Sequence, residues 1–272
     1  MQPIFYQSPA GYRAESKRIS VHWWITLPIV ATVALCAFSV IDKPTYGAYL
    51  QREGGILETL HSLLAFASAA VAARILFIRE VRADPLITAW LALFVVGGIY
   101  LGGEEASWGQ HYFGWQTPEE WAAINRQEET NLHNTSIWLD HVPRVAITLA
   151  IVLGGVVIPW MKLAGSRLLW ERVDFVYPPL ALISLAVLLL IGVIEDAIEA
   201  STDILDNVFA FSSGEMQENF IISFVFFYLL FLRRRALGIR SGAPISEMRA
   251  KAANDSRPAR TGLGVSRKPV AN

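Results

Sequence analysis

The sequence has little cysteine and little charge. Cys36 is the single cysteine among 272 residues, so neither an intramolecular disulfide nor a cysteine-rich metal site can form. Charged residues make up 17% of the chain, against about 25% in an average soluble domain. Lys and Arg number 23 and Asp and Glu number 24, so no basic excess favours nucleic acid as a partner. Any bound metal would need histidine and carboxylate ligands.

Long apolar runs account for much of the chain, in which 53% of residues are hydrophobic. A helix needs about 20 mostly apolar residues to cross a hydrocarbon core of roughly 30 Å. The runs predict an all-α integral membrane protein, a bundle of six transmembrane helices at about 21–41, 56–78, 85–103, 143–162, 175–195 and 215–235. The last run needs the polar first turns that follow Ser212-Ser213-Gly214-Glu215, a capping-box pattern.

Basic residues alternate between the connecting segments and predict an orientation. They cluster before the first run, after the second, after the fourth and at the end of the sixth, and such clusters normally stay in the cytoplasm. Both termini are therefore predicted to be cytoplasmic. The prediction divides the chain into an N-terminal segment 1–20, a transmembrane domain 21–236 and a basic tail 237–272, which we expect to be disordered.

The predicted outer loop 104–142 lies between the third and fourth runs. Thr117-Pro118-Glu119-Glu120 combines an N-cap residue, proline at the first helical position and glutamate in the first turn, which predicts a short helix in the outer interface. Loops longer than about 12 to 15 residues are usually functional or disordered, and this one is rich in aromatic residues. We expect it to be a lid over an outer cavity or a docking surface.

Polar residues at the outer ends of the second, third and fifth runs are predicted to lie at one depth. Ionisable groups at bilayer depth cost about 2.5 to 3.5 kcal/mol each, so they usually face a cavity, a partner or an ion. Glu104, Ser107 and His111 would share a helix face if the third helix continued through Trp108. Glu58 and His61 form an intrahelical pair or, less simply, one half of a di-iron motif.

The candidate site residues fall into three groups. The expected catalytic residues are Glu105 as general base, with Ser107 or Asn131 polarising a carbonyl group. The expected metal ligands are His111, His133 and one of Asp196 or Glu195. The secondary candidates are Glu58, His61, Glu104 and Glu199.

Two stretches resemble known families. Gly103–Gln110 and Glu129–Asn134 resemble paired motifs of a family of bacterial multi-pass membrane proteins, which implies the location of a site and no activity. Ser107-Trp108-Gly109-Gln110-His111 is similar to one element of the alkaline ceramidases, whose zinc site also uses a later His-x-x-x-His pair that the last run here lacks. The resemblances imply a cell membrane location, with the bacterial inner membrane favoured.

Two functions remain open from the sequence. The first is a metal-dependent hydrolase that uses one divalent ion, with zinc favoured, to cleave an amphiphilic small molecule drawn from the membrane lipids. The alternative is a protein without catalysis, namely a cation, proton or ligand-binding transport component or an accessory subunit of a membrane complex. Few polar residues occur in the inner halves of the runs, which favours an outer bowl over a continuous pore.

Overall fold

A computed structural model describes residues 4–17, 20–52, 54–166, 168–199 and 214–240, which form helices and connecting segments without a β-strand. The prediction of an all-α protein is confirmed. Five helical stretches are long and apolar enough to cross a membrane: His22–Ile41, Ile56–Leu76, Pro85–Glu105, Ile137–Leu163 and Leu180–Ile198. These stretches indicate a multi-pass membrane protein. The sixth predicted run corresponds to α12 (Gly214–Arg240), which is long but is not one of the five.

The other elements follow in chain order. They are α1 (Pro9–Lys17), α2 (Leu27–Ile41), α3 (Lys43–Tyr46), α4 (Ile56–Leu76), α5 (Arg79–Arg82), α6 (Pro85–Glu105), α7 (Gln110–Phe113), α8 (Glu119–Ala122), α9 (Ile137–Val152), α10 (Ile158–Leu163) and α11 (Ile183–Glu199). Short π-helical segments precede α2 and join α9 to α10. The predicted capping residues Ser212 and Ser213 and the chain beyond residue 240 lie outside the described residues.

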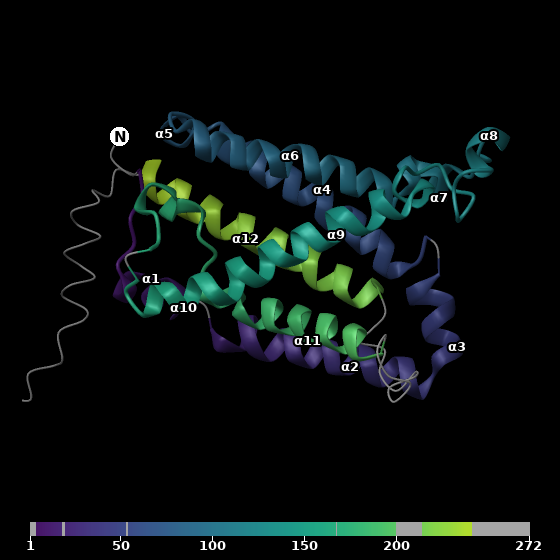
Figure 1. Cartoon of the computed structure of the whole chain (residues 1–272), viewed down its shortest axis with the longest axis horizontal. Coiled ribbons are helices and arrows are strands. Elements are labelled where there is room, and N and C mark those ends of the chain that lie inside the picture. The colour runs from purple at the N-terminus through teal and green to yellow at the C-terminus, as the bar shows by residue number, and fades with distance from the viewer. Residues whose placement is uncertain (1–3, 18–19, 53, 167, 200–213, 241–272) are drawn as a thin grey trace, which may run out of the picture.

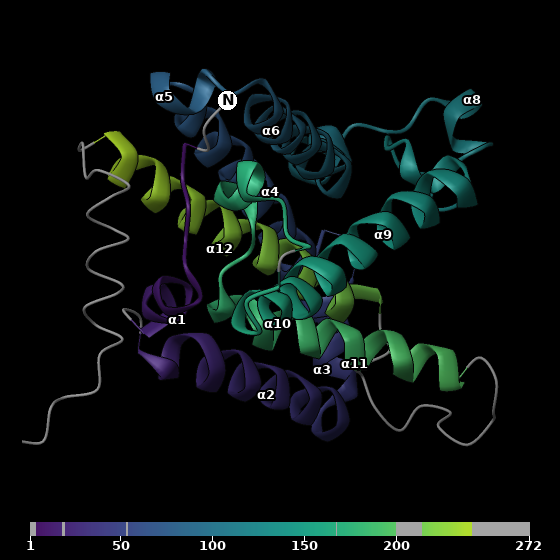
Figure 2. The same cartoon turned by 60° about the vertical axis from the view of Figure 1, so that its left-hand side comes forward.

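The long helices form one bundle with two distinct ends. In Figures 1 and 2, α4 and α6 lie side by side, and α12 packs against α4 on one side and α11 on the other. Helices α3, α7 and α8 lie at one end, which we call the loop end. Helices α1 and α5 lie at the opposite end, which we call the α1 end.

Small residues bring α4 and α6 close together. Gly98 faces α4 so closely that an added Cβ would lie 2.7 Å from the carbonyl oxygen of Ala65. One turn further along α6, the Ser62 hydroxyl donates a 2.8 Å hydrogen bond to the carbonyl oxygen of Gly102. Close helix contacts through small residues are typical of membrane bundles. This contact fixes where the ends of α4 and α6 meet at the loop end.

A buried stripe on α12 completes the interior. Ile221, Val225, Tyr228 and Leu232 are spaced three or four residues apart and are each at most 8% exposed. Residues with this spacing lie on one helix face, and Glu218 lies on the same face one turn closer to the loop end. The packing that buries the apolar stripe therefore also directs the Glu218 carboxylate into the bundle.

The outer surface of the bundle is apolar. Val33 on α2, Val96 on α6 and Leu149 on α9 are 61%, 68% and 56% exposed, respectively. Exposed large apolar side chains on several helices suit a lipid environment, where burial against protein is unnecessary.

Buried ion pairs close the α1 end. Arg235 is only 4% exposed. Its guanidinium donates hydrogen bonds of 2.9 and 2.6 Å to the two carboxylate oxygens of Glu15. Burial by itself raises the pKa of Glu15, but the charge and hydrogen bonds of Arg235 outweigh it and leave the pKa below its ordinary value. The ion pair therefore holds the N-terminal segment against the bundle.

Candidate functional site

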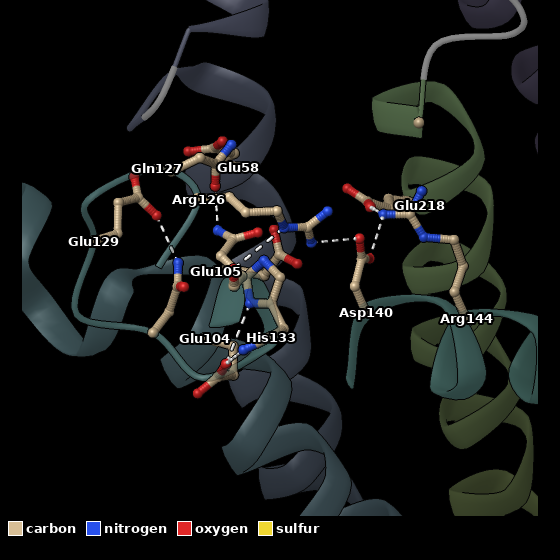
Figure 3. A pocket seen from close by; sticks show the side chains of 13 residues that line it. Glu58, Glu104, Glu105, Arg126, Gln127, Glu129, His133, Asp140, Arg144 and Glu218 are labelled. Atoms are coloured by element: carbon tan, nitrogen blue, oxygen red, sulfur yellow. Dashed lines mark hydrogen bonds and ion pairs between the residues drawn. The ribbon is translucent and has the colours of Figure 1, made fainter. Parts of the chain in front are cut away.

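A cavity of about 550 Å³ opens at the loop end. Its walls come from α4, α6, α9, α12 and the segment between α8 and α9 (Figure 3). Every lining residue except Gly214 has a polar or charged side chain, with six carboxylates against two guanidinium groups. The lining residues are Glu58, Glu104, Glu105, Arg126, Gln127, Glu129, Asn131, His133, Asn134, Asp140, Arg144, Gly214 and Glu218.

A group of three side chains, which we call the metal-type cluster, could hold a metal ion, and two of the three, Glu105 and Glu218, line the cavity. His61, Glu105 and Glu218 each offer one ligand atom, and the three atoms lie within 4.8 Å of one another. The Nδ1 atom of His61 is 3.8 Å from an oxygen of Glu105 and 4.0 Å from an oxygen of Glu218. These side chains come from α4, α6 and α12, three helices whose packing is fixed by the bundle interior.

Glu104, the neighbour of Glu105, holds the loop in place. One carboxylate oxygen accepts 2.7 Å hydrogen bonds from the backbone N–H groups of Leu132 and His133, and the other accepts a 2.7 Å bond from the Trp108 indole. The Nδ1 atom of the His133 ring lies 3.2 Å from the first oxygen. Glu104 is 2% exposed, so this carboxylate is an anchor for residues 132 and 133.

The His133 ring carries a shifted pKa. Burial alone lowers this pKa, but the hydrogen bond to Glu104 and the charges of Glu105, Glu104 and Asp140 raise it by more. The net effect is a pKa above the ordinary histidine value. His133 therefore lies at the cavity as a ring that holds its proton more firmly than a free histidine does.

The chain turns sharply after α6. Ser107, Trp108 and Gly109 have φ angles of 42°, 54° and 108°, so three consecutive residues adopt left-handed backbone conformations. Such conformations cost of order 1 kcal/mol or more for residues other than glycine. The third helix thus ends before Trp108, and Glu104, Ser107 and His111 do not share one helix face as they would if it continued.

A buried network holds this turn. The Ser107 hydroxyl donates a 2.8 Å hydrogen bond to Glu129, and the Asn131 amide donates bonds of 2.6 Å to Glu129 and 3.2 Å to the Ser107 oxygen. Asn125 donates to the side-chain oxygen of Asn131 at 2.8 Å. Ser107 is fully buried and does not line the cavity, whereas Asn131 does.

His111 lies on the far side of the same network. Its Nε2 atom is 3.3 Å from an oxygen of Glu129, and its ring packs against Gly54. It is not among the cavity-lining residues of the described chain. His111 therefore pairs with Glu129, and the predicted ligand set of His111, His133 and an acid of α11 is not the metal-type cluster found among the described residues.

Two acids of α11, Glu195 and Asp196, do not contribute to the cavity in the described part of the chain. Asp196 accepts a hydrogen bond from the Gln217 side chain of α12. The side chain of Glu199 lies outside the described residues. Of the secondary candidates, Glu58 and Glu104 line the cavity and His61 belongs to the metal-type cluster. The Glu58 carboxylate also accepts a 2.5 Å hydrogen bond from the backbone N–H of Gly54.

Several cavity residues are absent from the residues predicted from the sequence, among them Glu218, Asp140 and Arg144. Arg144 contacts Asp140 at 3.3 Å and also forms an ion pair with Glu218. The sequence held a signal for Glu218, since this residue continues the spacing of the apolar stripe on α12. An acidic residue near a helix N-terminus also suits the helix dipole, and that simpler interpretation hid the signal.

A short helix is present where the sequence predicts one, but its start differs. Helix α8 begins at Glu119, and Thr117 does not cap it. The Thr117 hydroxyl instead accepts a 2.9 Å hydrogen bond from Gln110, whose side-chain oxygen accepts a 2.6 Å bond from the backbone of Thr130. Thr117, the predicted capping residue, therefore contributes to contacts within the loop and not to the start of α8.

Comparison of the chain with known proteins finds no matching family model, no matching curated protein and no matching solved structure.

Proposed function

We propose that the chain is a metal-dependent hydrolase that cleaves a membrane amphiphile at the loop end of the bundle. The observation that carries this proposal is the convergence of His61, Glu105 and Glu218 from three helices beside a polar cavity. The basic clusters of the sequence predict that the loop end faces the outer side of the membrane.

The spacing of the three side chains suits a divalent ion. Imidazole nitrogen and carboxylate oxygen bind zinc at about 2.0 to 2.2 Å, so two ligand atoms of one ion lie roughly 3 to 4 Å apart. The separations of 3.8 and 4.0 Å around the His61 nitrogen need only small side-chain adjustments to meet this requirement. Three protein ligands leave a position for water, whose pKa a divalent ion lowers to about 7.

His133 is the residue that we expect to move protons. Glu104 fixes its Nδ1 side at 3.2 Å, so the other ring nitrogen can serve the cavity. In hydrolysis, the oxygen of water bonds to the carbonyl carbon, the ester or amide bond breaks, and the leaving group needs a proton. A histidine with a raised pKa holds its proton to a higher pH than an ordinary histidine does, so His133 is suited to supply that proton. Asn131 lines the cavity with an amide that can orient the carbonyl group.

The surroundings support an amphiphilic substrate. Trp108, Phe113 and Trp115 are 51%, 80% and 38% exposed in the segment that follows α6 at the loop end. Aromatic side chains concentrate where lipid meets water, so this segment is expected to lie at head-group level. A substrate with its tail among the apolar helix surfaces would present its ester or amide to the cavity.

The test is the metal content of the purified protein, followed by hydrolysis of short-chain lipid esters and amides. We expect about one zinc or other divalent ion per chain in the wild type. His61→Ala and Glu218→Gln should each lose it, while His22→Ala, at an exposed histidine outside the cavity, should keep it. An equal metal content in all four proteins would refute the ligand assignment.

A second candidate function is cation binding without catalysis, as in a transport component or an accessory subunit. The excess of six carboxylates over two guanidinium groups favours a cationic ligand of any kind. Metal binding without hydrolysis of any ester or amide tested would favour this candidate.

A further inference from the structure

Arg144 already forms an ion pair with Glu218, one of the proposed metal ligands. Its Nη2 atom donates a hydrogen bond to Oε1 of Glu218 (Figure 3). Oε2 of the same carboxylate lies 4.0 Å from the Nδ1 atom of His61. The one carboxylate thus faces a guanidinium through one oxygen and the metal-type cluster through the other.

Arg144 has a second carboxylate within reach. Asp140 lies four residues earlier on α9, and its Oδ1 atom is 3.3 Å from the same Nη2 atom of Arg144. The Arg144 side chain is 36% exposed, so it has room to change rotamer. Gly214 also lies against the guanidinium, since a Cβ at that position would be 3.0 Å from Nη1. A bulkier residue there would crowd the guanidinium.

The other cavity arginine provides a contrast. Arg126 donates to Asp140 at 3.0 Å and to the backbone oxygen of Asn134 at 3.2 Å. Neither of these contacts involves a residue of the metal-type cluster. The two arginines therefore share Asp140 but differ in their contact with Glu218.

A guanidinium and a divalent ion compete for the charge of one carboxylate. A cation that binds at His61, Glu105 and Glu218 would meet the positive charge of Arg144 a few ångströms away. Two like charges repel, and the repulsion falls if the guanidinium turns toward Asp140. In the absence of a metal ion, the same guanidinium balances the charge of Glu218, whose carboxylate lies within 4.8 Å of the Glu105 carboxylate.

We infer that Arg144 is a built-in counter-cation of the metal site, which pairs with Glu218 when the site is empty and is transferred to Asp140 when a divalent ion binds. The inference rests on the proposed function. It also adds a role during turnover, because the displaced guanidinium would present its N–H groups to an oxygen of the substrate beside the metal.

The test compares zinc affinities of the full-length protein in detergent, by competition with a fluorescent chelator. Arg144→Gln removes the charge and should bind zinc about tenfold more tightly than the wild type. That factor is the effect of one unit charge on a divalent ion about 6 Å away, even at the dielectric constant of water. Arg144→Lys keeps the charge and should stay close to the wild type. The matched control Arg126→Gln should change zinc affinity much less.

Unchanged or weaker zinc binding by Arg144→Gln overturns the inference. If the wild type binds zinc in that case, the proposed function stands and only the role of Arg144 fails. If neither protein binds zinc, both proposals fail. Zinc binding by Arg144→Gln alone would support the counter-cation and refute a metal-dependent activity of the wild type.

A measurement on the wild type removes the dependence on the folding of a variant. The side-chain Nε–H resonance of Arg144, assigned by its loss in Arg144→Lys, should shift when zinc is added. The resonance of Arg126 should shift less. An Arg144 resonance unaffected by saturating zinc would contradict the transfer from Glu218 to Asp140.

Discussion

Replacement of Glu104 by glutamine tests whether one carboxylate holds the loop over the cavity. In the wild type its two oxygens accept four hydrogen bonds, from the backbone of Leu132, the backbone and ring of His133, and the indole of Trp108. A glutamine has one oxygen and one NH2 group. If the oxygen keeps the two backbone donors, the NH2 group must face the indole N–H of Trp108, and two donors then oppose each other.

The expected cost follows from this change. A buried hydrogen bond to a charged group contributes about 1.5 to 3 kcal/mol, and an unsatisfied buried donor costs about 1 to 3 kcal/mol. One bond is lost and the others lose their charge, so Glu104→Gln should destabilise the closed loop by about 2 to 4 kcal/mol.

Hydrogen exchange measures this directly. Amides of segment 130–135 should exchange about 30-fold to 1000-fold faster in Glu104→Gln, because each 1.4 kcal/mol changes an opening equilibrium tenfold. Amides of α4 and α12 should change little. Glu120→Gln, at an exposed position of α8, serves as the control for loss of a negative charge. Equal exchange in the variant and the wild type would refute the anchoring role of Glu104.

Three further predictions follow from other contacts. Gly98→Val should destabilise the protein by about 1 to 3 kcal/mol by overpacking against α4, whereas Gly97→Val, which meets nothing within 4 Å, should not; unfolding temperatures compare the two. Stability from the lowered pKa of Glu15 is fully present above the unfolded pKa of about 4.5 and is lost as pH falls through the folded value. Glu15→Gln should therefore be less stable than the wild type at neutral pH, because Arg235 has lost its charged partner. The variant should also lack the loss of stability at low pH, where protonation removes the same partner from the wild type. Thermal unfolding at several pH values measures both effects. His133→Ala should retain bound metal but lose hydrolysis, measured by metal content beside activity; loss of metal would instead make His133 a ligand.

The helices could be predicted because each long apolar run has one stable form in a membrane. Backbone groups in hydrocarbon must bond within the segment, so a run of about 20 apolar residues becomes a helix whatever its neighbours are. The start of α6 likewise depends only on residues that are close together in the sequence. Asp84, just ahead of the apolar run, accepts a 2.9 Å hydrogen bond from the backbone N–H of Leu86. Predictions of this kind need no knowledge of other helices.

The end of α6 could not be predicted in that way. Ser107 and Trp108 adopt left-handed conformations that their own sequence does not favour, and the bonds from Ser107 and Asn131 to Glu129 offset that cost. These partners are more than 20 residues away along the chain. A local pattern therefore extends the helix, and the tertiary network ends it.

The gathering of several candidate site residues at one end of the bundle could be predicted from the sequence, but the direction in which each side chain faces around its helix axis could not. Glu58, Glu104, Glu105 and His133 meet at one cavity, as their common level suggests. Asp196 shares that level but faces Gln217 on α12. A topology that assigns residues to a depth leaves the rotation of each helix free, and only packing sets that rotation.

The adjacent residues Glu104 and Glu105 show why that rotation decides function. Successive helix positions differ by about 100° around the axis, so two neighbouring carboxylates must face different surroundings. The contact of Gly98 and Gly102 with α4 sets the rotation of α6, which directs Glu105 toward His61 and leaves Glu104 facing the loop. A small-residue packing face on α6 therefore determines which carboxylate joins His61 and Glu218 and which anchors the loop.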